Sequence, residues 1–110
     1  MKVGVVDLGT NTCTLVIGTV SENQFSPLLK ETRTVRLGSH RNSDRSISVQ
    51  GIRRIKEVIN YFIYITLKEH IHHLPIYATA ALREATNKEF IKTEIEALGN
   101  TTLHIIDGTE

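Results

Sequence analysis

A short segment near the amino terminus carries the residue types of a phosphate-binding turn. A run of valines that predicts a buried strand is followed by Asp7, Leu8, Gly9, Thr10, Asn11 and Thr12. Glycine and asparagine both tolerate positive φ, so the chain can turn tightly here and direct successive backbone N–H groups into one anion-binding concavity. The predicted phosphate-binding residues are Gly9, Thr10, Asn11 and Thr12, and the carboxylate of Asp7 can hold hydrated Mg²⁺. The alternative is an ordinary β-hairpin with local turn bonds.

A second candidate phosphate contact is Arg83. The segment 79–83 (Thr-Ala-Ala-Leu-Arg) places small residues at a predicted strand-to-helix junction, and the arginine follows about one turn later. Backbone N–H groups at a helix start favour an anion, and a guanidinium can bind two phosphate oxygens at once. The alternative is a surface arginine paired with Glu84 or Asp44.

Positive charge is concentrated in one part of the chain. The net charge of the 110 residues is +1, but segment 30–56 holds eight basic residues against two acidic ones, a balance of +6. A solvated face with a mobile loop and a surface for a polyanion both fit this pattern. No aromatic residue lies among these charges to stack on bases, so phosphate chains suit the segment better than DNA or RNA.

Three strands joined by short turns are predicted to position the first candidate site. The expected strands span 2–7, 13–20 and 25–37, and together they predict an antiparallel meander. Pro27 implies an edge position or a bulge in the third strand. Residues 38–46 are polar and lack periodicity, which predicts a flexible loop.

Helices alternate with strands in the rest of the chain. Apolar residues at three- and four-residue spacing predict a helix from Ser48, as its N-cap, to about His70. The segments expected next are a strand at 76–79, a helical turn at 80–85, a helix capped by Asn87 and stopped at Gly99, and a strand at 102–106. The order βββαβαβ predicts an α/β fold with a mixed five-stranded sheet, the ribonuclease H-like arrangement of actin-like ATPases and phosphotransferases.

Composition narrows the class of protein. Apolar residues make up 40% and charged residues 23% of the chain, which argues against disorder. There is no secretory signal and no stretch of about 18 apolar residues, and one cysteine permits no internal disulfide. We therefore expect a cytoplasmic protein with Cys13 in its core. The histidines at 70, 72 and 73 have no matching cysteine or carboxylate cluster, which argues against zinc.

Four segments together resemble the exopolyphosphatase / guanosine pentaphosphate phosphohydrolase family. They are residues 5–12, 34–38, 78–87 and 105–110, and they occur in that family's order and spacing across nearly the whole chain. The first segment alone would suit any actin-like ATPase or sugar kinase. The Thr-Ala-Ala-Leu-Arg-Glu-Ala-Thr-Asn stretch at 79–87 is what makes the resemblance specific.

The resemblance implies hydrolysis of a phosphoanhydride with Mg²⁺, releasing terminal phosphate from polyphosphate or from guanosine pentaphosphate. The Gly9–Asn11 turn would hold phosphate, Asp7 would lie at the metal, and Arg83 would neutralise charge on the reacting group. Glu110 matches the first glutamate of the family's Gly-x-Glu-Glu, whose second glutamate is the general base. Residues 1–110 would form the amino-terminal half-domain, incomplete at its C-terminus, with a homodimer made through the missing part.

The same resemblance implies that this chain supplies one wall of a site between two halves, and is inactive alone. Many members carry a basic residue where this chain has Thr14, so one phosphate contact is in question. Two other functions remain open: a non-catalytic module that binds polyphosphate or a phosphorylated nucleotide, and part of another actin-like phosphotransferase such as a sugar kinase.

Overall fold

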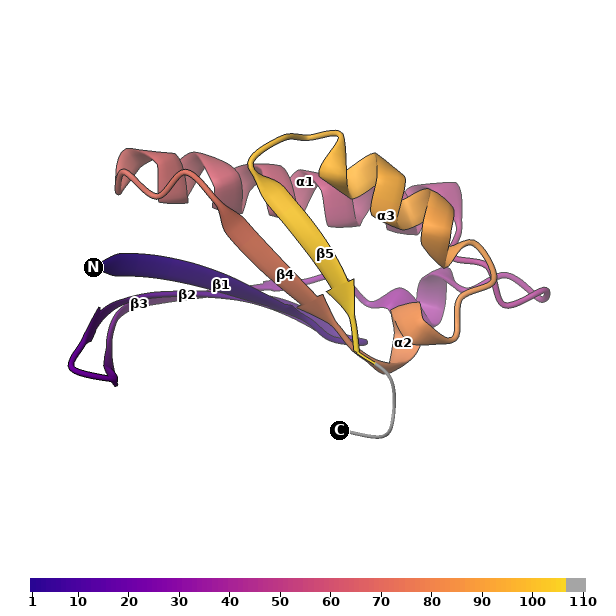
Figure 1. The fold of residues 1–110 in the computed structure, drawn as a ribbon. Coiled ribbons are helices and arrows are strands. Elements are labelled where there is room, and N and C mark those ends of the chain that lie inside the picture. The colour runs from indigo at the N-terminus through magenta and orange to yellow at the C-terminus, as the bar shows by residue number, and fades with distance from the viewer. Residues whose placement is uncertain (107–110) are drawn as a thin grey trace.

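A computed structural model describes residues 1–106, and it contains one sheet with helices packed on it (Figure 1). The strands are β1 (Lys2–Leu8), β2 (Thr12–Ser21), β3 (Gln24–Thr34), β4 (Leu74–Ala78) and β5 (Thr101–Ile105). The helices are α1 (Val49–Lys68), α2 (Ala80–Arg83) and α3 (Lys88–Glu96), and the short 3-10 turn η1 spans Leu37–His40.

The five strands form one mixed sheet in the order β3-β2-β1-β4-β5. β2 is antiparallel to both β1 and β3, whereas β4 is parallel to both β1 and β5. This confirms the predicted α/β fold with a βββαβαβ sheet, and α2 is the predicted helical turn after β4. Because β1, β4 and β5 run in the same direction, their carboxyl ends meet at one edge of the sheet.

Helices α1 and α3 lie on the same face of the sheet, with α3 beside β5 (Figure 1). The side chains that fill this layer come from alternate strand residues, such as Val6 and Leu8, and from the apolar stripe of α1, such as Ile59 and Phe62. Asp7 is exposed between its two buried neighbours. Since successive strand residues point to opposite faces, Asp7 lies on the face that α1 and α3 leave uncovered.

The β2–β3 hairpin confirms both expectations for Pro27. The turn residues Glu22 and Asn23 have φ of 53° and 65°, as a two-residue hairpin turn with two positive φ angles requires. β3 is an edge strand, and its register with β2 shifts between Ile17 and Gly18, opposite Pro27. A proline is tolerated here because an edge strand and a bulge both leave N–H groups unpaired.

The third predicted strand was too long at its carboxyl end. β3 stops at Thr34 instead of continuing to Leu37, because Arg36 takes a left-handed conformation with φ of 50° and Leu37 begins η1. The loop predicted at 38–46 also contains regular structure, since it includes most of η1 and a β-bridge that joins Arg41 to Ile47.

The helix cap predicted at Ser48 is confirmed, whereas the strand expected at 76–79 begins two residues earlier, at Leu74. Ser48 caps α1, and its Oγ accepts a hydrogen bond of 3.1 Å from the amide of Gly51. Pro75 directly precedes the strand expected at 76–79, but it lies inside β4. The ladder between β4 and β1 begins only at Ile76, so the missing N–H of Pro75 breaks no bond to β1. Within residues 1–106, no helix is long and apolar enough to cross a membrane.

Candidate phosphate-binding site

The turn between β1 and β2 has its carbonyl groups occupied and its central amides available. The amide of Gly9 donates to the carbonyl of Thr12 at 2.9 Å and closes the turn. The carbonyls of Thr10 and Asn11 accept three amides from residues 35–37, at 2.7 to 3.0 Å. No acceptor within the described part of the chain bonds the amides of Thr10 and Asn11. Free neighbouring N–H groups in a tight turn favour an anion.

Arg83 lies at the same sheet edge as this turn. The amide of Thr79, just before α2, donates to the carbonyl of Leu8 at 3.2 Å, one residue before Gly9. The Nη1 of Arg83 donates to the carbonyl of Ile106 at 3.2 Å, directly after β5. Segment 79–83 therefore contacts the carboxyl ends of β1 and β5, the two strands that flank β4, and the guanidinium of Arg83 lies at the end of β5.

The pairing of Arg83 with Glu84 or Asp44, considered as an alternative, is not observed. Glu84 instead lies 3.8 Å from Arg41, and no carboxylate of residues 1–106 is within ion-pair distance of Arg83. The guanidinium is half-buried and keeps donors for a ligand beside its single bond to Ile106. The phosphate-contacting role of Arg83 stays a prediction, as do those of the turn residues.

Asp7 offers one exposed carboxylate on the uncovered face of the sheet. It pairs in register with Thr14 and Tyr77, and the Oγ1 of Thr14 lies 3.2 Å from that of Thr32. The described residues contain no group of three His, Cys, Asp or Glu side chains that could hold a metal ion. Mg²⁺ keeps several waters and needs only one or two carboxylates besides substrate phosphates, so Asp7 next to the turn fits this ion.

Cys13 follows the turn and is buried, as predicted for a core residue. Burial, and secondly the negative charge of Asp7, raise the pKa of its thiol to about 12. Since the thiolate is the reactive form, we expect no labelling of the folded chain by a disulfide reagent at a pH of about 8. The same chain unfolded in urea should react fully. Rapid labelling before unfolding would contradict the buried position.

Two of the five histidines, His73 and His104, contact residues of β4 and β5. The Nε2 atoms of His73 and His104 each lie 3.2 Å from the Oγ1 of Thr102, and His104 stacks on Tyr77 with ring centroids 5.0 Å apart. His73 directly precedes β4, at the sheet edge opposite to the β1–β2 turn. None of these contacts involves a residue of the candidate site.

Asn87 has a role that its sequence position did not reveal. It occupies the predicted position at the start of α3, but its side chain makes no capping hydrogen bond. Its Oδ1 accepts from the amide of Ile47, and its Nδ2 donates to the carbonyl of Ile47, both at 3.0 Å. The amide thereby ties the loop before α1 to the segment that follows Arg83. No local pattern could show this, because the partner is 40 residues away.

Glu110 lies outside the described residues, so its predicted catalytic role stays a prediction.

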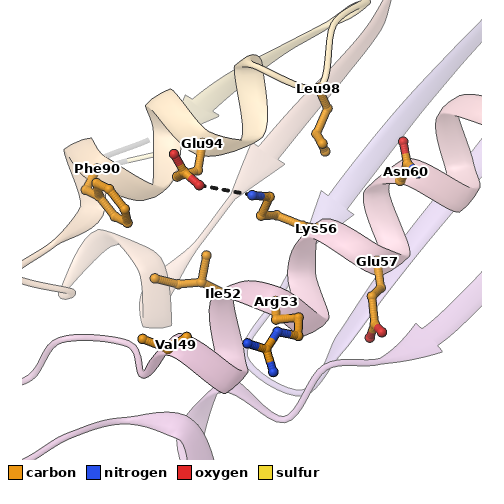
Figure 2. Close-up of a pocket in the computed structure, with 9 residues that line it drawn as sticks. All are labelled: Val49, Ile52, Arg53, Lys56, Glu57, Asn60, Phe90, Glu94 and Leu98. Carbon is orange, nitrogen blue, oxygen red and sulfur yellow. Dashed lines mark hydrogen bonds and ion pairs between the residues drawn. The ribbon is translucent and has the colours of Figure 1, made fainter.

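One apolar cavity of about 420 Å³ is formed between α1 and α3, on the helical side of the molecule (Figure 2). None of its nine lining residues belongs to the predicted site. The candidate site is therefore an open edge of the sheet, built from the turn, Asp7 and Arg83.

Known proteins are similar to this chain in sequence and in fold. The model of the Ppx/GppA phosphatase family matches residues 16–110. Exopolyphosphatase 1 of Mycobacterium bovis is 26% identical over 111 residues, covering 100% of this chain and 32% of its own length. An exopolyphosphatase from Cytophaga hutchinsonii superposes with a TM-score of 0.89 and 27% identity, over 98% of this chain and 35% of that one.

A more distant structure agrees on the fold. The Ppx/GppA family member from Aquifex aeolicus gives a TM-score of 0.86 at 20% identity, over 96% of this chain and 35% of its own. The chain thus has the ribonuclease H-like, actin-like ATPase fold, and it spans about a third of the length of the relatives that it matches. The family match covers most of the 110 residues, and this chain therefore belongs to the Ppx/GppA phosphatase family.

Proposed function

We propose that this chain supplies one wall of a phosphoanhydride hydrolase of exopolyphosphatase type. The observation that carries the proposal is the joint position of two anion-binding elements at one sheet edge. The amides of Thr10 and Asn11 have no acceptor within residues 1–106, and the guanidinium of Arg83 lies at the carboxyl end of β5, two strands from β1 at the same sheet edge. Relatives described as exopolyphosphatases support the choice of substrate class.

The residues of the wall would divide the work between binding and charge neutralisation. The turn amides and the hydroxyls of Thr10 and Thr12 would bind and orient a terminal phosphate. Arg83 would neutralise the charge that develops on the phosphoryl group during transfer. Asp7 would hold Mg²⁺, which when bound neutralises phosphate charge and orients its oxygens. Glu110 would lie close to the general base for the attacking water.

The finer features of this function are also proposals. The substrate is polyphosphate or the 5′ γ-phosphate of guanosine pentaphosphate, and the second wall comes from residues that the relatives have beyond this length. The 110-residue chain would therefore be inactive alone, and the complete protein would be a cytoplasmic homodimer. At the position where many family members have a basic residue, this chain has Thr14, whose hydroxyl lies close to that of Thr32. The absence of that positive charge removes one phosphate contact.

The test compares this chain with one continued to the length of its relatives. Phosphate release is measured from polyphosphate, guanosine pentaphosphate and ATP, each with and without Mg²⁺. We expect the longer chain to release phosphate from polyphosphate or guanosine pentaphosphate only with Mg²⁺, and the 110-residue chain to release none. Turnover by the short chain would show that the second wall is dispensable. Hydrolysis of ATP alone would favour another actin-like phosphotransferase, and binding without turnover would favour a binding module.

A further inference from the structure

A second cavity, lined mostly by polar residues, lies at the same sheet edge as the candidate site, on the other side of the β1–β2 turn from Arg83. It has a volume of about 390 Å³, and we name it the Arg36 pocket; its lining residues are Thr34, Val35, Arg36, His40, Gln50 and Arg54. They come from the end of β3, from η1 and from the first two turns of α1. The amides of Val35 and Arg36 both donate to the carbonyl of Asn11. One wall of the pocket is therefore bonded directly to the predicted phosphate-binding turn.

The lining of the Arg36 pocket is cationic. Arg36 is exposed, and within residues 1–106 it has no ion pair. Arg54 donates from Nε to the carbonyl of Thr34 at 2.9 Å, which fixes its guanidinium against the pocket wall. Its Nη1 lies 3.7 Å from Glu57, a solvent-exposed pair of the kind that contributes little. No lining residue is acidic, so the guanidinium of Arg36 and the Nη2 of Arg54 remain available to an anion.

The backbone at Arg36 points to a reason for this arrangement. Its φ of 50° is uncommon for a residue with a long side chain, which costs about 1 kcal/mol relative to an extended or helical conformation. The conformation lets Val35 and Arg36 both reach the carbonyl of Asn11 while the Arg36 side chain lines the pocket. Strained residues of this kind gather at ligand-binding sites, where the strain fixes a side chain in place.

We propose that the Arg36 pocket is a second phosphate subsite, which binds the part of a polyphosphate chain that extends past the β1–β2 turn. The inference rests on the proposed function, which places the terminal phosphate at the turn and Arg83. Guanidinium groups bind phosphate oxygens in pairs, and clustered positive charge raises the local concentration of a polyanion. His40 carries the one ring in the lining and no Phe, Tyr or Trp is present to form a stacking platform for bases, so a phosphate chain fits the pocket better than a single-stranded nucleic acid.

The test uses a variant of the 110-residue chain with both pocket arginines replaced. Arg36→Asn removes the charge and keeps a residue that tolerates positive φ, and Arg54→Gln is added to it. The matched control is Arg53→Gln. Arg53 is an exposed arginine on the same helix as Arg54, but it lines the separate α1–α3 cavity (Figure 2). Circular dichroism confirms that each variant is folded. Affinity for long-chain polyphosphate and for pyrophosphate is measured by calorimetry at several salt concentrations.

We expect the double variant to bind long-chain polyphosphate about threefold to tenfold more weakly, with a smaller dependence on salt. Pyrophosphate, which the turn alone can hold, should bind as before, and Arg53→Gln should match the unmodified chain. An equal loss in the Arg53→Gln chain, an equal loss for pyrophosphate, or no loss in the double variant would each overturn the subsite. So would an unmodified chain that binds no polyphosphate at low salt.

A third variant separates this proposal from the proposed function. If Arg83→Gln weakens polyphosphate binding and the double variant does not, the subsite is wrong while the proposed function stands. If the double variant loses affinity and Arg83→Gln keeps it, the subsite stands and the placement of the terminal phosphate is wrong.

Discussion

Replacing Arg83 by glutamine is expected to slow phosphate release from polyphosphate by roughly 10²- to 10³-fold in a chain continued to the length of its relatives. Glutamine is too short to reach the carbonyl of Ile106, so the replacement also removes the one hydrogen bond that the guanidinium makes within the described residues. The fold around α2 should be retained because only this half-buried side-chain bond is lost together with the positive charge. Because that charge would contact the bound phosphate and act more strongly on the developing transition state, KM should rise and kcat should fall by the larger factor.

Two comparisons separate this effect from a general loss of positive charge. Arg53→Gln removes the same charge from an exposed position on α1 and should leave the rate unchanged. Arg83→Lys keeps the charge but loses the forked pair of donors, and should recover only part of the rate. If Arg83→Gln turned over polyphosphate at the original rate, Arg83 would not contact the reacting phosphate.

Replacing Asn87 by alanine is expected to lower the free energy of unfolding by about 2–3 kcal/mol. The side chain satisfies both the amide and the carbonyl of Ile47, each at 3.0 Å, and Ile47 is buried. Removing the side chain leaves two polar backbone groups without their partners, and the loop before α1 loses its bond to the start of α3. Urea unfolding followed by circular dichroism measures the difference.

The matched control is Asn60→Ala, since Asn60 is exposed on α1, lines the α1–α3 cavity and makes no side-chain hydrogen bond within residues 1–106. It should change stability by less than about 0.5 kcal/mol. Asn87→Asp keeps the acceptor for the Ile47 amide and loses the donor, so it should be intermediate. Equal stability of the Asn87→Ala chain and the unmodified chain would show that water replaces both bonds.

Local chemistry explains the parts of the fold that could be predicted from the sequence. The β1–β2 turn, the hairpin at Glu22, the Ser48 cap and the position of Pro27 each depend on residues within a few positions of one another. The order of the predicted elements, with three strands followed by alternating helices and strands, predicted the mixed sheet. These signals come from backbone preferences and from the alternation of buried positions, which a sequence displays directly.

Long-range contacts explain what could not be predicted. The strand expected to reach Leu37 stops early because residues 35–37 turn aside to donate to the carbonyls of Thr10 and Asn11. Arginine at a positive φ has no sequence signature, unlike glycine. Asn87 was expected to cap a helix, but its side chain bonds Ile47, 40 residues away. The candidate site was predicted as separate pieces, and the sheet topology brings Arg83 to the same sheet edge as the turn.

In the β1–β2 turn the carbonyls are hydrogen-bonded and the central amides are not, so hydrogen exchange at the turn can report whether an anion is bound there. The amides of Val35, Arg36 and Leu37 are held by the turn carbonyls, whereas the amides of Thr10 and Asn11 have no acceptor in the described chain. In deuterium exchange, the first group should therefore be slow and the second fast in the free protein. An anion seated in the turn would slow only the second group. The exchange rate of the Thr10 and Asn11 amides would therefore report phosphate binding, with the amides of residues 35–37 as an internal reference. This measurement works even where no turnover occurs.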